Sequence, residues 1–181
     1  MRTTLFYTWD PGAACWSAWL EDSPLGVIRV WASPAGLTRI ALQQPAPQPA
    51  APAGEGAGAP PDCLAQAVRQ LDEYLHGRRQ EFSLPIDWGG RDGFLVRAQQ
   101  AACAIPFGQV RTYGELARSL GRPTAARAVG SAMAHNPLPP LVPCHRLVKS
   151  PRGLNGDDDG LELKAWLLAR EGHRVNRYRL V

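Results

Sequence analysis

The first forty residues alternate apolar and small or polar positions in a way that predicts β-strands. The alternation runs through positions 16–20, and a β-rich run follows at 27–31. Turn signals separate the runs at Ser23-Pro24-Leu25-Gly26 and at Pro34-Ala35-Gly36. We therefore expect a small antiparallel meander within residues 1–43. The next stretch, 44–60, is nearly all Pro, Ala, Gly and Gln. It cannot bury enough apolar surface to order itself, so we expect an extended loop.

Helical periodicity replaces the alternation after residue 60. One helix is predicted from its cap at Asp62 to Gly77, a second from 94 to about 105, and a last one from Leu161 to Glu171 before Gly172. The apolar face of the first is formed by Leu64, Val68, Leu71 and Leu75, and that of the second by Phe94, Ala98, Ala101 and Ile105.

Two further short helices are predicted between these. Thr112 and Glu115 have the spacing of a capping box, and Gly121-Arg122-Pro123 ends the helix they begin. Thr124 is placed to cap a second helix over 125–135. The pair has a helix-turn-helix pattern, although many helical hairpins bind nothing. The fold class is therefore α/β, with a small N-terminal domain (1–88) carrying an antiparallel sheet and a helical C-terminal domain (89–181).

Composition limits the classes of protein that this chain can be. Its 181 residues, 45% hydrophobic and 20% charged, are enough for one domain or two small ones. No apolar run approaches the roughly 20 residues of a membrane-spanning helix, and no secretory signal is apparent at the start. Four cysteines form no CxxC pair, so we expect a reducing cytoplasm and no membrane partner.

The net charge of +4 is distributed unevenly. Residues 96–135 hold five arginines and one acid, a local balance of +4, whereas Asp157, Asp158 and Asp159 lie in a row further on. A phosphate-facing patch would concentrate charge in this way. Ordinary solvated arginines on helix surfaces are an equally good interpretation of the charge alone.

Reactive chemistry is concentrated at Cys144-His145-Arg146, directly after the apolar, proline-rich run 138–143. A cysteine attacks as its thiolate, which a nearby imidazole and positive charge favour. Neighbouring residues of an extended chain point apart, so His145 would reach Cys144 through a water or a bend, and Glu171 is a candidate to polarise it. A structural cysteine beside a surface histidine is the alternative. A metal site is disfavoured, because no second Cys or His lies at ligand spacing.

Several ordered motifs together resemble one family. The stretch Asn136-Pro137 to Pro143-Cys144-His145-Arg146 resembles the active-site signature of the methylated-DNA–protein-cysteine methyltransferases. Similar stretches lie at 105–110, 113–117, 126–130 and 164–172, and more faintly at 23–26 and 34–37. The resemblance implies a DNA repair alkyltransferase that moves the alkyl group of O6-alkylguanine, and of O4-alkylthymine as a further substrate, onto its own cysteine.

The same resemblance implies how DNA is held. The helix pair would enter the minor groove of double-stranded DNA containing an alkylated base, and the damaged base would be flipped out. Arg127 would fill the gap, and Tyr113 would help to rotate the nucleotide by its phosphate. The remaining residues assigned to the DNA interface are Thr112 and the small residues Ala125, Ala126 and Ala128.

It also implies the chemistry. Cys144 would be the alkyl acceptor, and Glu171 would polarise His145, which takes the thiol proton through a water. Asn136 would brace the active-site turn, and Arg146 would be structural and pair with an acid. Pro139 and Val148 are placed to line the base pocket or to belong to the core. No metal or nucleotide cofactor is implied, and each molecule, a monomer, would act once.

One departure from the family pattern leaves alternatives open. The family has a tyrosine in its glycine-rich loop whose hydroxyl donates to the departing guanine oxygen, and Asp157 occupies that place here. An ionised carboxylate cannot donate a hydrogen bond. The chain would then be a slower alkyltransferase, a relative that binds alkylated bases without accepting the alkyl group, or an acceptor for another electrophile. Alternatively, Asp157 lies on a solvated loop tip away from the base.

Replacing Asp157 by Tyr tests these alternatives. If Asp157 is the weak point of the leaving-group site, Asp157→Tyr speeds alkyl transfer from O6-methylguanine DNA, measured as a single-turnover rate. An unchanged rate would favour the solvated loop tip.

Overall fold

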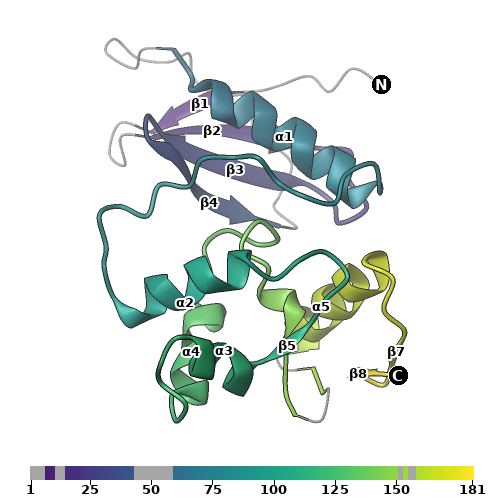
Figure 1. Ribbon diagram of the computed structural model, residues 1–181. Helices are drawn as coiled ribbons and strands as arrows, with labels where there is room; N and C mark the ends of the chain where they lie inside the picture. The colour runs from purple at the N-terminus through teal and green to yellow at the C-terminus, as the bar shows by residue number, and fades with distance from the viewer. Residues whose placement is uncertain (1–6, 11–14, 43–58, 151–152, 155–157) are drawn as a thin grey trace. The chain divides into compact units, whose positions relative to one another are not determined.

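The computed structural model describes residues 7–10, 15–42, 59–150, 153–154 and 158–181. It divides into two compact units, 1–90 and 91–181 (Figure 1). Most of the stretch 44–60, and Asp157, lie outside the described residues. Within the described chain, no helix is long and apolar enough to cross a membrane.

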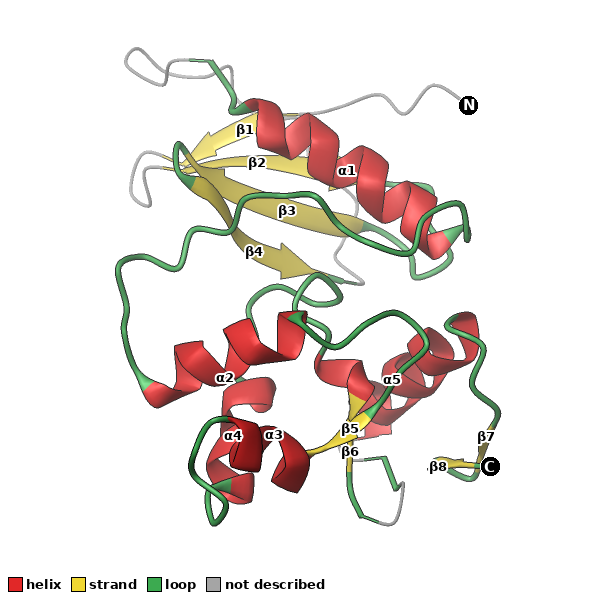
Figure 2. Cartoon of the chain, in the orientation of Figure 1, coloured by secondary structure: helices red, strands yellow, loops and turns green. Residues whose placement is uncertain are grey.

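The first unit is built on a four-stranded antiparallel sheet. Its strands are β1 (Tyr7–Asp10), β2 (Cys15–Leu20), β3 (Ile28–Ser33) and β4 (Gly36–Ala41). They lie in sequence order, each paired with the next (Figure 2). The meander that the alternation predicts is confirmed.

The helix α1 (Asp62–Leu75) packs against β2 and β3 and buries its apolar face there. On the opposite face of the sheet, the guanidinium of Arg29 lies 4.7 Å from the ring of Trp19 and 4.6 Å from that of Trp31. All six residues of β2 are therefore buried, which explains why its alternation of apolar and polar residues is imperfect.

The edge of the sheet at β4 is closed by the chain that follows α1. Leu37 exchanges backbone hydrogen bonds with Pro85 and Asp87, each of 2.9 Å. Gly36 makes this approach possible, because a Cβ there would lie 2.7 Å from the carbonyl oxygen of Pro85. Residues 85–87 are held against the sheet for that reason.

Three helices pack together in the second unit: α2 (Phe94–Cys103), α3 (Tyr113–Ser119) and α4 (Ala126–Ala134). The predicted capping box at the start of α3 is confirmed. The Thr112 hydroxyl accepts from the Glu115 amide at 3.1 Å, and the Glu115 carboxylate accepts from the Thr112 amide at 2.6 Å. The bonds that the Glu115 carboxylate accepts from the Thr112 amide and from the Thr112 hydroxyl, the latter 2.9 Å long, hold the pKa of Glu115 below its ordinary value.

Two predicted helix caps are wrong by one residue. Pro61 occupies the cap position of α1, so Asp62 is already helical and makes no capping hydrogen bond. Ala125 occupies the cap position of α4, where Thr124 was expected. A turn closed by the hydrogen bond from the Ala125 amide to the Arg122 carbonyl, 2.9 Å long, delays the start of α4.

The second unit also has short strands that the sequence did not predict. β5 (Arg111–Thr112) pairs in parallel with β6 (Leu147–Val148), and β7 (Val175–Asn176) forms a hairpin with β8 (Arg179–Leu180). Two residues are too few to show a period. The last helix, α5 (Asp158–Arg170), begins before the predicted Leu161.

Candidate active site

A cavity of about 340 Å³ lies within the second unit. That volume is at the lower end of those that bind small ligands. Its walls come from α3, α4, α5 and the chain between α4 and β6. The lining residues are Tyr113, Gly130, Met133, Ala134, Asn136, Pro139, Cys144, His145, Gly160, Leu163, Lys164 and Leu167.

Cys144 begins a single 3₁₀ turn, η1 (Cys144–Arg146), and is half-buried at the cavity wall. The turn is closed by the Arg146 amide, which donates to the Pro143 carbonyl at 3.0 Å. Because the chain bends here instead of running extended, Cys144 and His145 both line the cavity.

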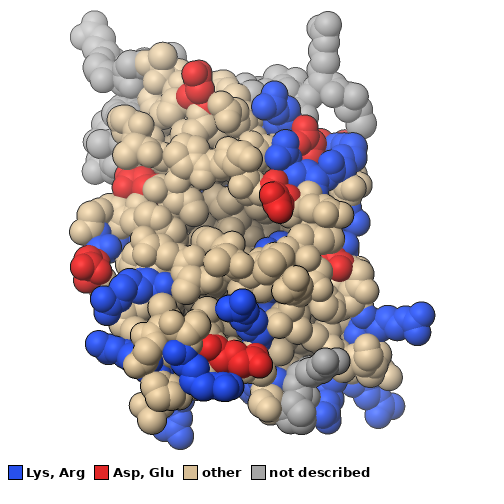
Figure 3. Space-filling model, viewed as in Figure 1, with Lys and Arg blue, Asp and Glu red and all other residues tan. Residues whose placement is uncertain are grey.

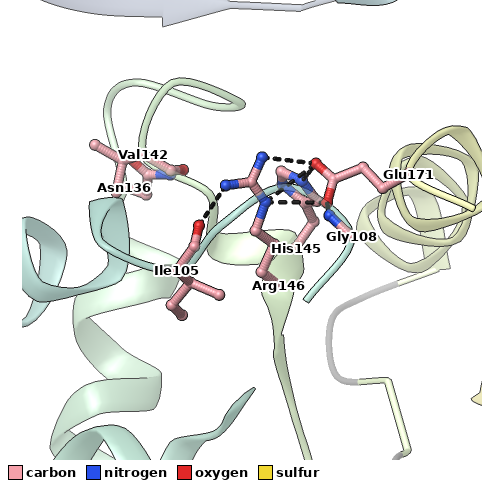
Figure 4. Close-up of polar contacts among 7 residues, drawn as sticks. All are labelled: Ile105, Gly108, Asn136, Val142, His145, Arg146 and Glu171. Carbon is pink, nitrogen blue, oxygen red and sulfur yellow. Dashed lines mark hydrogen bonds and ion pairs between the residues drawn. The ribbon is translucent and has the colours of Figure 1, made fainter. Parts of the chain in front are cut away.

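Behind the cavity, the Glu171 carboxylate accepts hydrogen bonds from several residues (Figure 4). Its side chain is fully buried, and His145 Nε2 lies 2.8 Å from Oε1. The Arg146 guanidinium donates to both carboxylate oxygens, at 2.8 Å from Nη2 and at 3.0 and 3.1 Å from Nε. The Gly108 amide donates to Oε2 at 3.1 Å. This one carboxylate thus binds two other segments of the chain, η1 and the loop that holds Gly108.

The loop before β5 completes this arrangement. Arg146 Nη1 donates to the Ile105 carbonyl at 2.5 Å, so the buried guanidinium is held at both ends. Gly108 adopts φ 72°, and a Cβ there would meet the Glu171 carbonyl oxygen at 3.4 Å. A glycine is therefore favoured where the backbone turns its amide toward the carboxylate.

The surroundings of His145 determine its protonation. Burial lowers the pKa of His145; the bond to Glu171 opposes this effect, and the charges of Arg146 and Lys164 add to it. The imidazole is therefore neutral at pH 7. Since a carboxylate only accepts hydrogen bonds, we assign the single ring proton to Nε2, which leaves the lone pair on Nδ1.

The Asn136 side chain forms hydrogen bonds to both ends of the segment 138–142, which precedes Cys144. Its amide nitrogen donates to the Val142 carbonyl at 2.8 Å, and its oxygen accepts from the Leu138 amide at 3.0 Å. These bonds fix the turn between α4 and η1, which places the cysteine.

Lys164 is a site residue that sequence reasoning missed. It is 6% exposed, lines the cavity, and donates to the Leu147 carbonyl and, at 3.4 Å, to the Tyr113 hydroxyl. Burial lowers the pKa of Lys164 to about 8, and Cys144 opposes that shift. The available signal was its position seven residues before Glu171, which places both on one face of a helix.

The other expected site residues divide into two groups. Tyr113 and Pro139 line the cavity, whereas Val148 does not. Val148 is 1% exposed and packs with Leu154 and Leu168 in a core cluster, the alternative that the sequence left open. The residues expected at DNA lie on or beside α3 and α4. Arg127 is exposed, and the other four are half-exposed: Thr112, Ala125, Ala126 and Ala128.

A half-exposed thiol on a ligand-sized cavity, beside a neutral histidine held by a buried carboxylate, defines a cysteine-nucleophile site on an α/β scaffold. Comparison with known proteins agrees with this class. Residues 93–173 match the family model described as "6-O-methylguanine DNA methyltransferase, DNA binding domain", and 18–88 match that of its ribonuclease-like domain. The chain belongs to the 6-O-methylguanine DNA methyltransferase family.

Individual relatives cover most of the chain. The methylated-DNA–protein-cysteine methyltransferase of Mycolicibacterium paratuberculosis is 39% identical over 83% of this chain and 88% of its own length. The human protein of the same name is 36% identical over 86% and 80%. The structure of Mycobacterium tuberculosis OGT in complex with DNA is similar at a TM-score of 0.68, with 35% identity over 83% and 89%.

Removing the charge of Glu171 tests its importance for stability. Glu171→Gln leaves the buried Arg146 without a counter-charge, so we expect the free energy of unfolding in urea to fall by about 3–5 kcal/mol. Glu162→Gln, on the exposed side of the helix α5 that precedes Glu171, is the matched control and should change the free energy of unfolding by less than about 0.5 kcal/mol. Equal effects of the two substitutions would contradict the assigned role.

Proposed function

We propose that this chain is a DNA repair alkyltransferase that transfers the alkyl group of O6-alkylguanine in DNA irreversibly to its own Cys144. O4-alkylthymine is a second substrate of the same chemical kind. The observation that carries the proposal is the pairing of His145 with Glu171 behind a cysteine that faces a cavity of base size. Relatives named methylated-DNA–protein-cysteine methyltransferases support it.

The transfer is a single displacement. The Cys144 thiol gives its proton through a water to Nδ1 of His145, and Glu171 stabilises the imidazolium that forms. The sulfur then bonds to the alkyl carbon as the bond from that carbon to O6 breaks, with the electron pair going to the guanine. The released guanine takes up one proton. A thioether does not leave again, so each molecule acts once.

The remaining residues at the cavity position these groups. Asn136 braces the turn that holds Cys144, and Arg146 supplies the counter-charge that Glu171 needs. Pro139 lines the pocket against the base. Tyr113, at the cavity wall and at the first residue of α3, is placed to act on the nucleotide's phosphate as the base turns in.

We assign DNA recognition to α3 and α4, acting as a helix-turn-helix in the minor groove. Arg127 is exposed near the start of α4, and small residues lie on either side of it, so the backbone can approach the groove floor. The guanidinium would replace the flipped base in the stack. The described cysteines are all free, which fits action in a reducing cytoplasm.

The mass of the intact protein tests the reaction directly. After incubation with duplex DNA carrying one O6-methylguanine, we expect one added methyl group, located by peptide mapping on Cys144. Cys144→Ser should show no adduct but retain selective binding to the lesion.

Three other outcomes would contradict the proposal in distinct ways. An adduct on another residue would contradict the assigned nucleophile. Selective binding without an adduct would define a lesion-binding protein, and the absence of both would point to a different electrophile.

Arg127→Ala tests the role assigned to that side chain. Without the Arg127 guanidinium, nothing replaces the flipped base between its neighbouring base pairs. The free energy of unpairing and unstacking that base, a few kcal/mol, is then not offset. Transfer from duplex DNA should slow at least about tenfold, while transfer from a single-stranded oligonucleotide should change little. Arg69→Ala, an exposed helix arginine of the first unit, is the control. Equal slowing on both DNA forms would argue against base replacement.

A further inference from the structure

The C-terminal hairpin presents one apolar side and one basic side. Val175 and Leu180 are paired across it and pack against the core cluster of Val148, Leu154 and Leu168. Because side chains alternate along a strand, the residues beside them point away from that core. Those residues are Arg174 and Arg179, and Arg177 lies in the turn between the strands; all three are exposed.

Arg174 and Arg177 of this hairpin are exposed. Neither Arg174 nor Arg177 forms an ion pair within the part of the chain that the structure describes. The nearest acid in sequence, Glu171, is buried and bound to His145 and Arg146. Glu171 therefore adds no negative charge to this surface.

A row of backbone pairings connects the hairpin to the active site. Thr112 pairs with Val148 at the ends of β5 and β6, the next residue Lys149 pairs with Gly153, and Gly153 pairs with Arg179. Three strand spacings of about 4.8 Å place the hairpin about 14 Å from the start of α3. Lys149 follows β6 directly and is exposed.

The space-filling view agrees with this arrangement. Lys and Arg side chains gather along the lower part of the second unit on both sides, over the helices α3 and α4 and over the region of the hairpin (Figure 3). The basic surface therefore extends beyond the helix pair.

We propose that Lys149, Arg174 and Arg177, the hairpin surface, form a second phosphate-binding site for the DNA duplex. This inference rests on the proposed function and extends it. With a rise of about 3.4 Å per base pair, 14 Å corresponds to about four base pairs, so the surface contacts backbone phosphates about that far from the flipped nucleotide. It contributes affinity that does not depend on the lesion.

The chemistry of the surface favours a phosphate backbone over a membrane. A membrane-binding surface combines cations with an exposed apolar side. Here Val175 and Leu180, on the apolar side of the hairpin, are turned into the core, and Tyr178 and Val181 are the large hydrophobic residues that the hairpin exposes at its turn and its end. Arginines projecting from a hairpin fixed on a folded core suit a rigid polyanion.

The salt dependence of binding to undamaged duplex DNA tests the surface. Each phosphate contact contributes about 0.9 to the slope of log K against log salt concentration. The double variant Arg174→Gln/Arg177→Gln should therefore reduce the slope by about 2. Arg69→Gln/Arg78→Gln, which removes two exposed charges from the first unit, should leave it unchanged.

Two controls separate failure of this inference from failure of the proposed function. The wild-type chain must methylate Cys144 on lesion DNA, which tests the function alone. The hairpin variant should react with O6-benzylguanine as a free base at the wild-type rate, which shows an intact fold and pocket. A wild-type salt slope in a hairpin variant that reacts normally would overturn the inference.

Replacing single DNA phosphates by uncharged methylphosphonates locates the phosphates that the hairpin surface contacts. Single methylphosphonates placed along both strands of lesion DNA should weaken wild-type binding at positions three to five nucleotides from the lesion. The hairpin variant should no longer respond at those positions, while the control variant should. Identical responses of the wild-type chain and the hairpin variant at every position would also overturn the inference.

Discussion

The buried carboxylate of Glu171 is the constraint on which the second unit depends. Taking a charge out of water costs several kcal/mol unless hydrogen bonds and an opposite charge replace the solvent. Donors from His145, Arg146 and Gly108 replace it here. His145 and Arg146 lie on η1 and Gly108 lies in the loop before β5, so satisfying this carboxylate fixes where that loop, η1 and the end of α5 meet.

The same arrangement determines the chemistry of His145. A carboxylate alone beside an imidazole favours the protonated ring, which cannot accept a proton. Burial, together with the charge of Arg146, lowers the pKa of His145 and keeps the ring neutral. Arg146 therefore does more than hold the fold, because its charge offsets the effect of Glu171 and preserves a base beside the cysteine.

The short β5–β6 pair connects the helix α3 to the chain that follows Cys144. On one side β5 leads directly into α3, whose first residue, Tyr113, lines the cavity. On the other side β6 leads to Lys149 and the hairpin surface. Two residues per strand are enough for this connection. They fix the start of α3 beside the strand that follows Cys144 and precedes Lys149.

The sequence by itself determined the features that depend on local order. The meander follows from alternation and turn residues, and the capping box of α3 follows from Thr112 and Glu115, because those interactions join residues that are close in the chain. The motif around Cys144 was sufficient to name the candidate nucleophile and its histidine. Tertiary structure decided the rest: that Glu171 is shared by His145 and Arg146, that Lys164 faces the cavity, and that Val148 belongs to the core. These outcomes depend on which distant segments pack together and exclude water, and no local pattern of residues encodes that.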